Sequence, residues 1–253
     1  MPEPILLKLG GSVVTDKRND GVVDHAAIGE IADLLGASDF RGVIVHGAGS
    51  CGHPEAQRYG LARGADCTNR TGITVTHEAV ASLNRTVVTV LCGAGIDAVG
   101  VHPLAACTAD DGRIVSFEEE PLRLLLGLGC VPVLHGDVVM DRRRGACIVS
   151  GDQLVAYLAP RLGLSRIGLM TNVPGVLDAG GAVVPRISRA DAGALAIGAS
   201  STMDVTGGMG GKVAELLRLA ENGISSHVFG SDRLADFLAS RPHGGTEIVP
   251  EDA

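Results

Sequence analysis

Short apolar segments alternate with amphipathic segments along almost the whole chain, and this alternation constrains the fold more than any other feature. The apolar segments have the length of buried strands and are Ile5–Leu9, Gly42–Val45, Ala98–Val101, Val131–Leu134, Arg166–Met170 and His227–Phe229. The amphipathic segments have the apolar spacing of helices and are Asp24–Leu35, Pro54–Leu61, Thr71–Leu91, Glu118–Leu126, Asp152–Leu162, Ser188–Ile197 and Met209–Asn222. This alternation predicts an α/β fold with a mostly parallel sheet, helices on both of its faces, and ligands at the loops that follow the strands.

Two stretches depart from the alternation, because Val138–Val149 and Val173–Val184 each hold two short apolar runs around a turn and favour β-hairpins. Hydrophobic residues make up 45% of the chain but aromatic residues only 2%, so the core must consist of Val, Leu, Ile and Ala, as is usual for parallel sheets. No linker divides the sequence. We expect one domain over residues 1–253, divided near Ser150 into two lobes.

Charge and hydropathy exclude several classes of partner. The net charge of −8 argues against a nucleic-acid or membrane-surface footprint, and no apolar run approaches the roughly 18 residues of a membrane span. The N-terminal segment lacks the pattern of a signal peptide. The six cysteines form no CxxC pair, which argues against a zinc site and against a disulfide framework. We therefore expect a cytoplasmic protein with reduced thiols and a small-molecule substrate.

Glycine-rich loops follow the first two predicted strands. Gly10 and Gly11 come directly after Ile5–Leu9, with Ser12 behind them and Lys8 close before them, which suits either an anion site or a tight exit from the strand. The loop after Gly42–Val45 matches G-x-G-x-x-G. A dinucleotide site needs an acidic residue at a strand end about 20 residues later, and Asp66 lies in a polar loop instead. What remains is an anion site at a helix N-terminus, beside His53.

Two further loops join glycine to charged side chains. Gly151 and Asp152 open a predicted helix, where Ser150 or Asp152 would act as the N-cap or Asp152 would orient lysines around a phosphate. Four glycines precede Lys212 in STMDVTGGMGGKV, although the pattern differs from a Walker A loop. The chain has only three lysines among 21 basic residues, and all three, Lys8, Lys17 and Lys212, lie in or beside these loops. Because a lysine ammonium can follow a moving phosphoryl group, the combination favours phosphoryl transfer.

At these positions the chain resembles the amino acid kinase superfamily and, within it, the branch of the isopentenyl phosphate kinases. The resemblance covers nearly the whole chain, in the segments LKLGGSVVTDK, HGAGSCGHPEAQRYGL, PVLHGDVV, SGDQL, TNVPGV and DVTGGMGGKV. The pattern GHP-x-A-x-x-YG from Gly52 to Gly60 and the DVTGGM segment are the most specific of these. The superfamily implies a three-layer αβα sandwich, usually as a homodimer. It also implies an acceptor-binding lobe of about 1–150 and a nucleotide-binding lobe of about 151–253.

The resemblance also implies roles for the matching residues. The nucleotide would be held by Lys8, Gly10, Gly11, Ser12, Ala48, Thr171, Asn172, Gly175, Asp204, Gly207, Gly208 and Lys212. The acceptor phosphate would be held by Gly47, Ala48, Gly49, Gly52, His53 and Gly151. The catalytic residues would be Lys8, Lys17, His53, Asp152 and Lys212, with Asp152 positioning the lysines. ATP and Mg²⁺ would be the cofactors, and no metal is expected on protein side chains.

A phosphate acceptor needs no general base, because a phosphate monoester with a second pKa near 6 is already a dianion at neutral pH. The resemblance implies ATP-dependent phosphorylation of isopentenyl phosphate to the diphosphate, which belongs to isoprenoid biosynthesis by an alternative mevalonate route. The alternatives are a kinase for another small phosphate or phosphonate such as fosfomycin, and a non-catalytic ATP-sensing module. A carboxylate acceptor is less favoured because His53 suits a phosphate, and the full set of lysines with Asp152 argues against a sensor.

A few positions depart from the family pattern. Ala48 stands within the usual triple glycine, Cys51 replaces an aromatic residue, and the segment 171–177 reads TNVPGVL where TDVDGVY is usual, which affects the expected contacts to the nucleotide base. The helix Thr71–Leu91 carries an apolar stripe that would either line a pocket for a prenyl tail or pack into the core. Its residues are Ile73, Val75, Val80, Leu83 and Val87.

Overall fold

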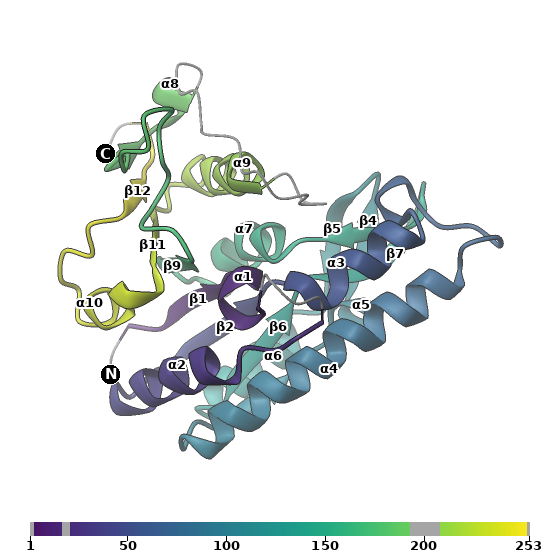
Figure 1. The fold of residues 1–253 in the computed structure, drawn as a ribbon, viewed down its shortest axis with the longest axis horizontal. Helices are drawn as coiled ribbons and strands as arrows, with labels where there is room; N and C mark the ends of the chain where they lie inside the picture. The colour runs from purple at the N-terminus through teal and green to yellow at the C-terminus, as the bar shows by residue number, and fades with distance from the viewer. Residues whose placement is uncertain (1–2, 17–20, 193–207, 252–253) are drawn as a thin grey trace.

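An eight-stranded sheet forms the centre of the molecule in a computed structural model, which describes residues 3–16, 21–192 and 208–251. Its strands run in the order β10-β12-β11-β9-β1-β2-β6-β3 (Figure 1). Their bounds are β1 Ile5–Leu9, β2 Gly42–His46, β3 Ala98–Gly100, β6 Val131–His135, β9 Arg166–Thr171, β10 Arg186–Ile187, β11 Ser226–Gly230 and β12 Thr246–Ile248. All neighbours are parallel except β11 and β12. All six predicted strands are confirmed, while β10 and β12 extend the sheet beyond them.

Helices cover the two faces of this sheet. Their bounds are α1 Gly11–Val14, α2 His25–Ala37, α3 Gly49–Arg58, α4 Thr71–Gly93, α5 Pro103–Ala106, α6 Glu120–Gly127, α7 Gly151–Leu162, α8 Arg189–Ala192, α9 Gly208–Ala220 and α10 Leu234–Leu238. On one face α2, α4 and α10 pack against the strands, and on the other face α7 and α9 do so (Figure 1). The side chains between these layers are mainly aliphatic. The predicted three-layer αβα sandwich is therefore confirmed.

A second sheet of four strands, in the order β5-β4-β7-β8, packs on the α7 side of the core. Its bounds are β4 Cys107–Asp110, β5 Arg113–Phe117, β7 Asp137–Asp141 and β8 Gly145–Val149. Strands β7 and β8 pair antiparallel and confirm the hairpin predicted over Val138–Val149. The other predicted hairpin is reduced to one bridge between Leu177 and Val183, where backbone hydrogen bonds also join Asp178 to Ala182.

Helix α3 begins at Gly49, five residues before the predicted start at Pro54. Proline in a helix has no N–H for the carbonyl four residues earlier, which here is that of Ser50. That carbonyl instead accepts a hydrogen bond of 3.2 Å from the backbone N–H of Gly21. The helix therefore continues through Pro54, and His53 lies inside it rather than at its first residue.

The structure tests some of the remaining sequence expectations. Of the predicted helix Ser188–Ile197, residues 188–192 lie within the described residues, and α8 spans Arg189–Ala192 of them. All six cysteines are free thiols. Within the described ranges, no helix is both long enough and apolar enough to cross a membrane. The division into two lobes near Ser150 stays a prediction.

Candidate active site

One cavity of about 720 Å³ opens where β1, β2, β6 and β9 end. Every predicted site residue within the described part of the chain lines it, and these residues are Lys8, Gly10, Gly11, Ser12, Gly47, Ala48, Gly49, Gly52, His53, Gly151, Asp152, Thr171, Asn172, Gly175, Gly208 and Lys212. The remaining predicted residues, Lys17, Asp204 and Gly207, lie outside the described residues. The topology thus brings together four loops that are far apart in the sequence, as expected for carboxyl ends of parallel strands.

The loops after β1 and β2 touch each other through their glycines. A Cβ on Gly11 would lie 2.5 Å from the backbone N of Gly49, and a Cβ on Gly47 would lie 2.6 Å from the backbone N of Gly11. Gly49 also has a φ of +52°, which side chains other than that of glycine rarely allow. These glycines therefore permit close packing of two backbones, which places the N–H groups of both loops at one opening.

Lys8 enters the cavity from the central strand of the sheet. Side chains alternate between the two faces of a strand. Leu7 and Leu9 face the core under α2 and α4, while Leu6 faces α7 and α9. Lys8 shares the face of Leu6 and is only 5% exposed. Its ammonium therefore reaches the start of α7 instead of water.

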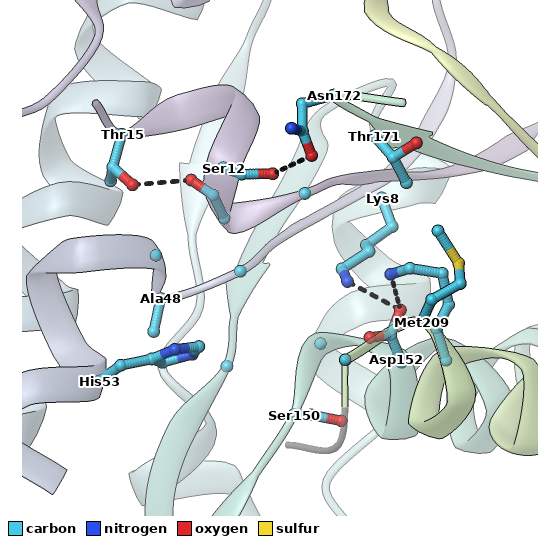
Figure 2. A pocket seen from close by; sticks show the side chains of 18 of the residues that line it. Lys8, Ser12, Thr15, Ala48, His53, Ser150, Asp152, Thr171, Asn172 and Met209 are labelled. Atoms are coloured by element: carbon cyan, nitrogen blue, oxygen red, sulfur yellow. Dashed lines mark hydrogen bonds and ion pairs between the residues drawn. The ribbon is translucent and has the colours of Figure 1, made fainter. Parts of the chain in front are cut away.

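A carboxylate joins this ammonium to a second one. Asp152 Oδ1 accepts hydrogen bonds from Lys8 Nζ at 2.7 Å and from Lys212 Nζ at 3.0 Å (Figure 2). All three residues are less than 10% exposed. Burial alone would raise the pKa of Asp152, but the nearby ammonium groups of Lys212 and Lys8 hold it well below its usual range. Burial lowers the pKa of Lys8 to about 8, although Asp152 opposes the shift. The cluster thus holds two cationic side chains on a single anion.

The start of α7 explains why Asp152 is available to the lysines. Ser150 caps the helix, since its Oγ accepts a hydrogen bond of 3.1 Å from the backbone N–H of Gln153. Asp152 is then released from capping, and its position in the first turn points its carboxylate at Lys8 and Lys212. Lys212 comes from α9, which packs beside α7. The backbone at Gly151 approaches Lys8 closely, because a Cβ there would lie 3.3 Å from Lys8 Cε.

The opposite side of the cavity is more apolar. His53 projects from α3 toward the cavity, across from Lys8 and Asp152 (Figure 2). Ala56, Val80 and Ile148 line the wall around it. Of the predicted apolar stripe on α4, Val80 alone lines this cavity. Leu83 and Val87 pack into the core, and Ile73 packs beside Leu61 in a smaller apolar cluster.

The loop after β9 closes the cavity near the first glycine loop. Ser12 Oγ donates a hydrogen bond of 2.9 Å to Asn172 Oδ1 (Figure 2). Thr171 is buried, and its hydroxyl donates to the carbonyl of Val173 at 2.7 Å. A Cβ on Gly175 would lie 2.8 Å from Thr246 Oγ1, so this glycine lets the loop pack against β12. The loop is therefore held from both halves of the chain.

The cavity is poor in groups that would hold a metal ion by themselves. In the ranges that the structure covers, no three His, Cys, Asp or Glu side chains gather in a way that could bind a metal. The carboxylate of Asp152 is already engaged by two lysines. Mg²⁺ commonly binds through substrate phosphates with few protein ligands, and the residues here fit that mode.

Several cavity residues were not predicted as site residues, among them Gln57, Thr76, Asp137 and Ile148. Asp137 was within reach of sequence reasoning, because it follows His135-Gly136 just as Ala48 follows His46-Gly47. Thr76 and Ile148 carry no comparable signal. They reach the cavity only because α4 packs beside α3 and β8 packs beside the short turn Leu61–Arg63 that follows α3.

The chain has extensive similarity to known proteins. The model of the Amino acid kinase family matches residues 3–230. The isopentenyl phosphate kinase of Haloferax volcanii is 43% identical over 242 residues, which cover 95% of this chain and 96% of that protein. That of Methanothermobacter thermautotrophicus is 39% identical and covers 88% of this chain and 90% of its own. The acetylglutamate kinase of Cereibacter sphaeroides is 28% identical, over 89% of this chain and 82% of that protein.

Solved structures give the same picture. An X-ray structure of isopentenyl phosphate kinase superimposes with a TM-score of 0.87 at 33% identity, covering 98% of this chain and 100% of that one. The product complex of the Thermoplasma acidophilum isopentenyl phosphate kinase superimposes with a TM-score of 0.78 at 25% identity, covering 97% and 99%.

Proposed function

The chain belongs to the amino acid kinase family and, within it, to the isopentenyl phosphate kinases, and from this premise we propose that it transfers the γ-phosphoryl group of ATP to isopentenyl phosphate. An oxygen of the acceptor phosphate forms a bond to the γ-phosphorus. The bond between that phosphorus and the bridging oxygen breaks, and its electron pair leaves with ADP. The products are isopentenyl diphosphate and ADP. The observation that carries the proposal is the buried pair of lysines on Asp152 between two glycine loops.

On the donor side, Lys8 and Lys212 neutralise the phosphates of ATP while Asp152 holds both ammonium groups in place. The N–H groups of the loop at Gly10 and Gly11 add further donors, with the hydroxyl of Ser12 beside them. We assign Lys17, Asp204 and Gly207 to the same nucleotide site on the basis of the family pattern alone. Mg²⁺ arrives with ATP as part of the substrate, and when bound it supplies charge neutralisation on the phosphate oxygens.

On the acceptor side, His53 and the N–H groups of the Gly47–Gly52 loop bind the acceptor phosphate, and Gly151 lies across from them. Two anions must approach in line, so the main task of the protein is charge cancellation and positioning. The dianionic acceptor is itself the nucleophile, and the cavity accordingly needs no general base. The wall of Ala56, Val80 and Ile148 provides apolar contact for a short alkenyl tail.

A coupled assay of ADP release tests the proposal with four acceptors: isopentenyl phosphate, dimethylallyl phosphate, fosfomycin and acetylglutamate. We expect the highest kcat/KM with isopentenyl phosphate. Turnover confined to fosfomycin would support a phosphonate kinase instead, and turnover confined to acetylglutamate would contradict a phosphate acceptor. No turnover, together with tight ATP binding, would favour a nucleotide sensor.

The assignment of His53 has its own test. His53→Ala removes a donor to the acceptor phosphate and is expected to raise the KM for that acceptor roughly 10- to 100-fold, with little change in the KM for ATP. His25→Ala, on the exposed start of α2, is the matched control. Equal increases in both KM values would contradict the assignment.

The proposal includes a cytoplasmic location and a homodimer, both supported by the family resemblance. Analytical ultracentrifugation of the full chain tests the second point. A monomer at micromolar concentration would overturn it.

A further inference from the structure

Two histidines occupy equivalent positions beneath the proposed acceptor site. His46 ends β2, His135 ends β6, and the two are paired in register on neighbouring strands. Both are fully buried, and their rings stack with centroids 5.6 Å apart. Each is followed by a glycine that lines the cavity. The mechanism proposed above uses neither imidazole.

Each ring faces the carbonyl of the glycine that follows it. His46 Nδ1 lies 3.0 Å from the carbonyl oxygen of Gly47, and His135 Nδ1 lies 3.1 Å from that of Gly136. A carbonyl oxygen only accepts hydrogen bonds, so Nδ1 must carry the proton in both rings. Burial lowers the pKa of His46 to about 4 and that of His135 to about 3, so both rings are neutral at pH 7.

The opposite nitrogens are held by donors that suit this tautomer. The side-chain amide nitrogen of Asn84 lies 3.1 Å from His46 Nε2 and 3.2 Å from the carbonyl oxygen of Val133. Only the NH₂ group of Asn84 can serve both partners, and His46 Nε2 therefore accepts. His102 Nδ1 lies 2.8 Å from His135 Nε2, and it donates to that nitrogen because Nδ1 of His135 carries the proton. Asn84 thus fixes the tautomer of His46 independently of the Gly47 carbonyl.

The bond to Gly47 has a consequence for the loop above it. A trans peptide group is planar, and its C=O and N–H point in opposite directions. When His46 holds the carbonyl of Gly47 toward the core, the N–H of Ala48 must point away from the core. Ala48 lines the cavity and precedes the first turn of α3. The neutral ring of His46, which lies on the core side of the loop, therefore sets the orientation of the Ala48 N–H.

We propose that His46 is a positioning residue for the acceptor phosphate: held in the Nδ1–H tautomer by Asn84 and stacked on His135, it fixes the Gly47–Ala48 peptide so that the Ala48 N–H faces the phosphate. The proposal rests on the proposed function for the place of the phosphate but not for the identity of its tail. His135 and His102 repeat the arrangement at Gly136. Asp137 and His77 are the charged or titratable groups next to this cluster, and His77 binds Asp137 at 3.1 Å.

Two nearly isosteric substitutions test the proposal. In His46→Asn the amide nitrogen stands close to the position of Nδ1 and can donate to Gly47, whereas His46→Leu fills similar space without a donor. We expect His46→Leu to raise the KM for the acceptor about tenfold and His46→Asn by less than about threefold, with the KM for ATP unchanged in both. Equal effects of the two substitutions, or an equal rise in the KM for ATP, would overturn the proposal.

A second measurement determines the tautomer directly in the wild-type protein. Long-range ¹H–¹⁵N spectra of the ¹⁵N-labelled wild-type protein report the tautomer of each histidine, and His46→Asn assigns the His46 signals. We expect the Nδ1–H tautomer for His46, and the Nε2–H tautomer would refute the proposal.

Titration of the wild-type protein and of both variants with inorganic phosphate tests the positioning role without depending on which substrate the enzyme uses. If isopentenyl phosphate is not turned over, weaker phosphate binding by His46→Leu than by His46→Asn still supports the positioning role.

Discussion

At the scale of single residues, the site depends on a carboxylate that two ammonium groups share. Asp152→Asn keeps the size of the side chain but removes the anion between Lys8 and Lys212, so the two cations repel each other and move apart. We expect kcat to fall by about 100-fold or more, because misplacing groups around a transferring phosphoryl is costly. Steady-state kinetics check this, with Glu30→Gln on the exposed side of α2 as an acid-to-amide control. An Asp152→Asn variant with near wild-type kcat would contradict the positioning role.

Loss of the proton from Lys8 is expected to slow the reaction at alkaline pH. Burial lowers the pKa of Lys8 to about 8 in the free protein, and above that pH the side chain is neutral and attracts phosphate weakly. We expect kcat/KM for ATP to fall as the pH rises through about 8. The decrease in kcat should occur at higher pH, since the phosphates of bound ATP favour the charged form of Lys8. In Lys8→Arg, whose side chain stays charged, the decrease in kcat/KM near pH 8 should disappear. If this decrease persists in Lys8→Arg, it arises from another group.

At the scale of elements, the close contact of the loops after β1 and β2 predicts sharply different effects for two glycines. In Gly11→Ala the new Cβ would meet the backbone of Gly49 at 2.5 Å, and we expect a loss of about 1–3 kcal/mol in stability together with a higher KM for ATP. Gly29→Ala lies within α2, where a Cβ meets no atom within 4 Å. It should stabilise the protein by up to about 1 kcal/mol. Thermal unfolding and ATP kinetics of both variants check the contrast, and equal melting temperatures would contradict it.

The elements also show where sequence reasoning succeeds and where it stops. Buried parallel strands such as β1 and β2 are continuous apolar runs, so they are visible in the sequence. Strands β4 and β5 are short and polar at many positions and were not predicted. The local pattern that favours them is the Asp111-Gly112 turn, where both residues have positive φ. Pro54 suggested a helix start because prolines favour that position. The contact that lets α3 begin at Gly49, between Ser50 and Gly21, is tertiary and has no local pattern.

In the candidate site, too, only residues marked by a local sequence pattern could be predicted. Lys8, Asp152 and Lys212 could be predicted because glycine loops and strand ends mark them in the sequence. The cavity wall could not, because Thr76 and Ile148 belong to elements whose tertiary packing, against α3 and against the turn Leu61–Arg63, decides which of their residues face inward. The buried histidines give an intermediate case. The repeated His-Gly pair is visible in the sequence, but the hydrogen bond from Asn84 that fixes the tautomer of His46 is not.

At the scale of the whole molecule, both halves of the chain contribute to one sheet and to one cavity. Strand β9, from the second half, pairs with every residue of β1, and β1 pairs with β2 on its other side. The lysine cluster likewise joins Lys8 from the first half to Asp152 and Lys212 from the second. The net charge of −8 is compatible with binding two anions, because Lys8 and Lys212 place positive charge locally at this cavity. Sheet and cavity together make separate unfolding of two lobes unfavourable.

This arrangement predicts one cooperative unfolding transition that responds as a unit to ligand. In calorimetry of the full chain we expect a single peak. A non-hydrolysable ATP analogue with Mg²⁺ at about 100 times its Kd adds about 2.7 kcal/mol, which should raise the Tm by about 5–10 °C for a chain of this size. Asp152→Asn should show a smaller shift at the same ligand concentration, while Glu30→Gln should match the wild type. Two peaks, of which only one moves with the nucleotide, would instead show that the segments before and after about residue 150 unfold as separate lobes despite the shared sheet.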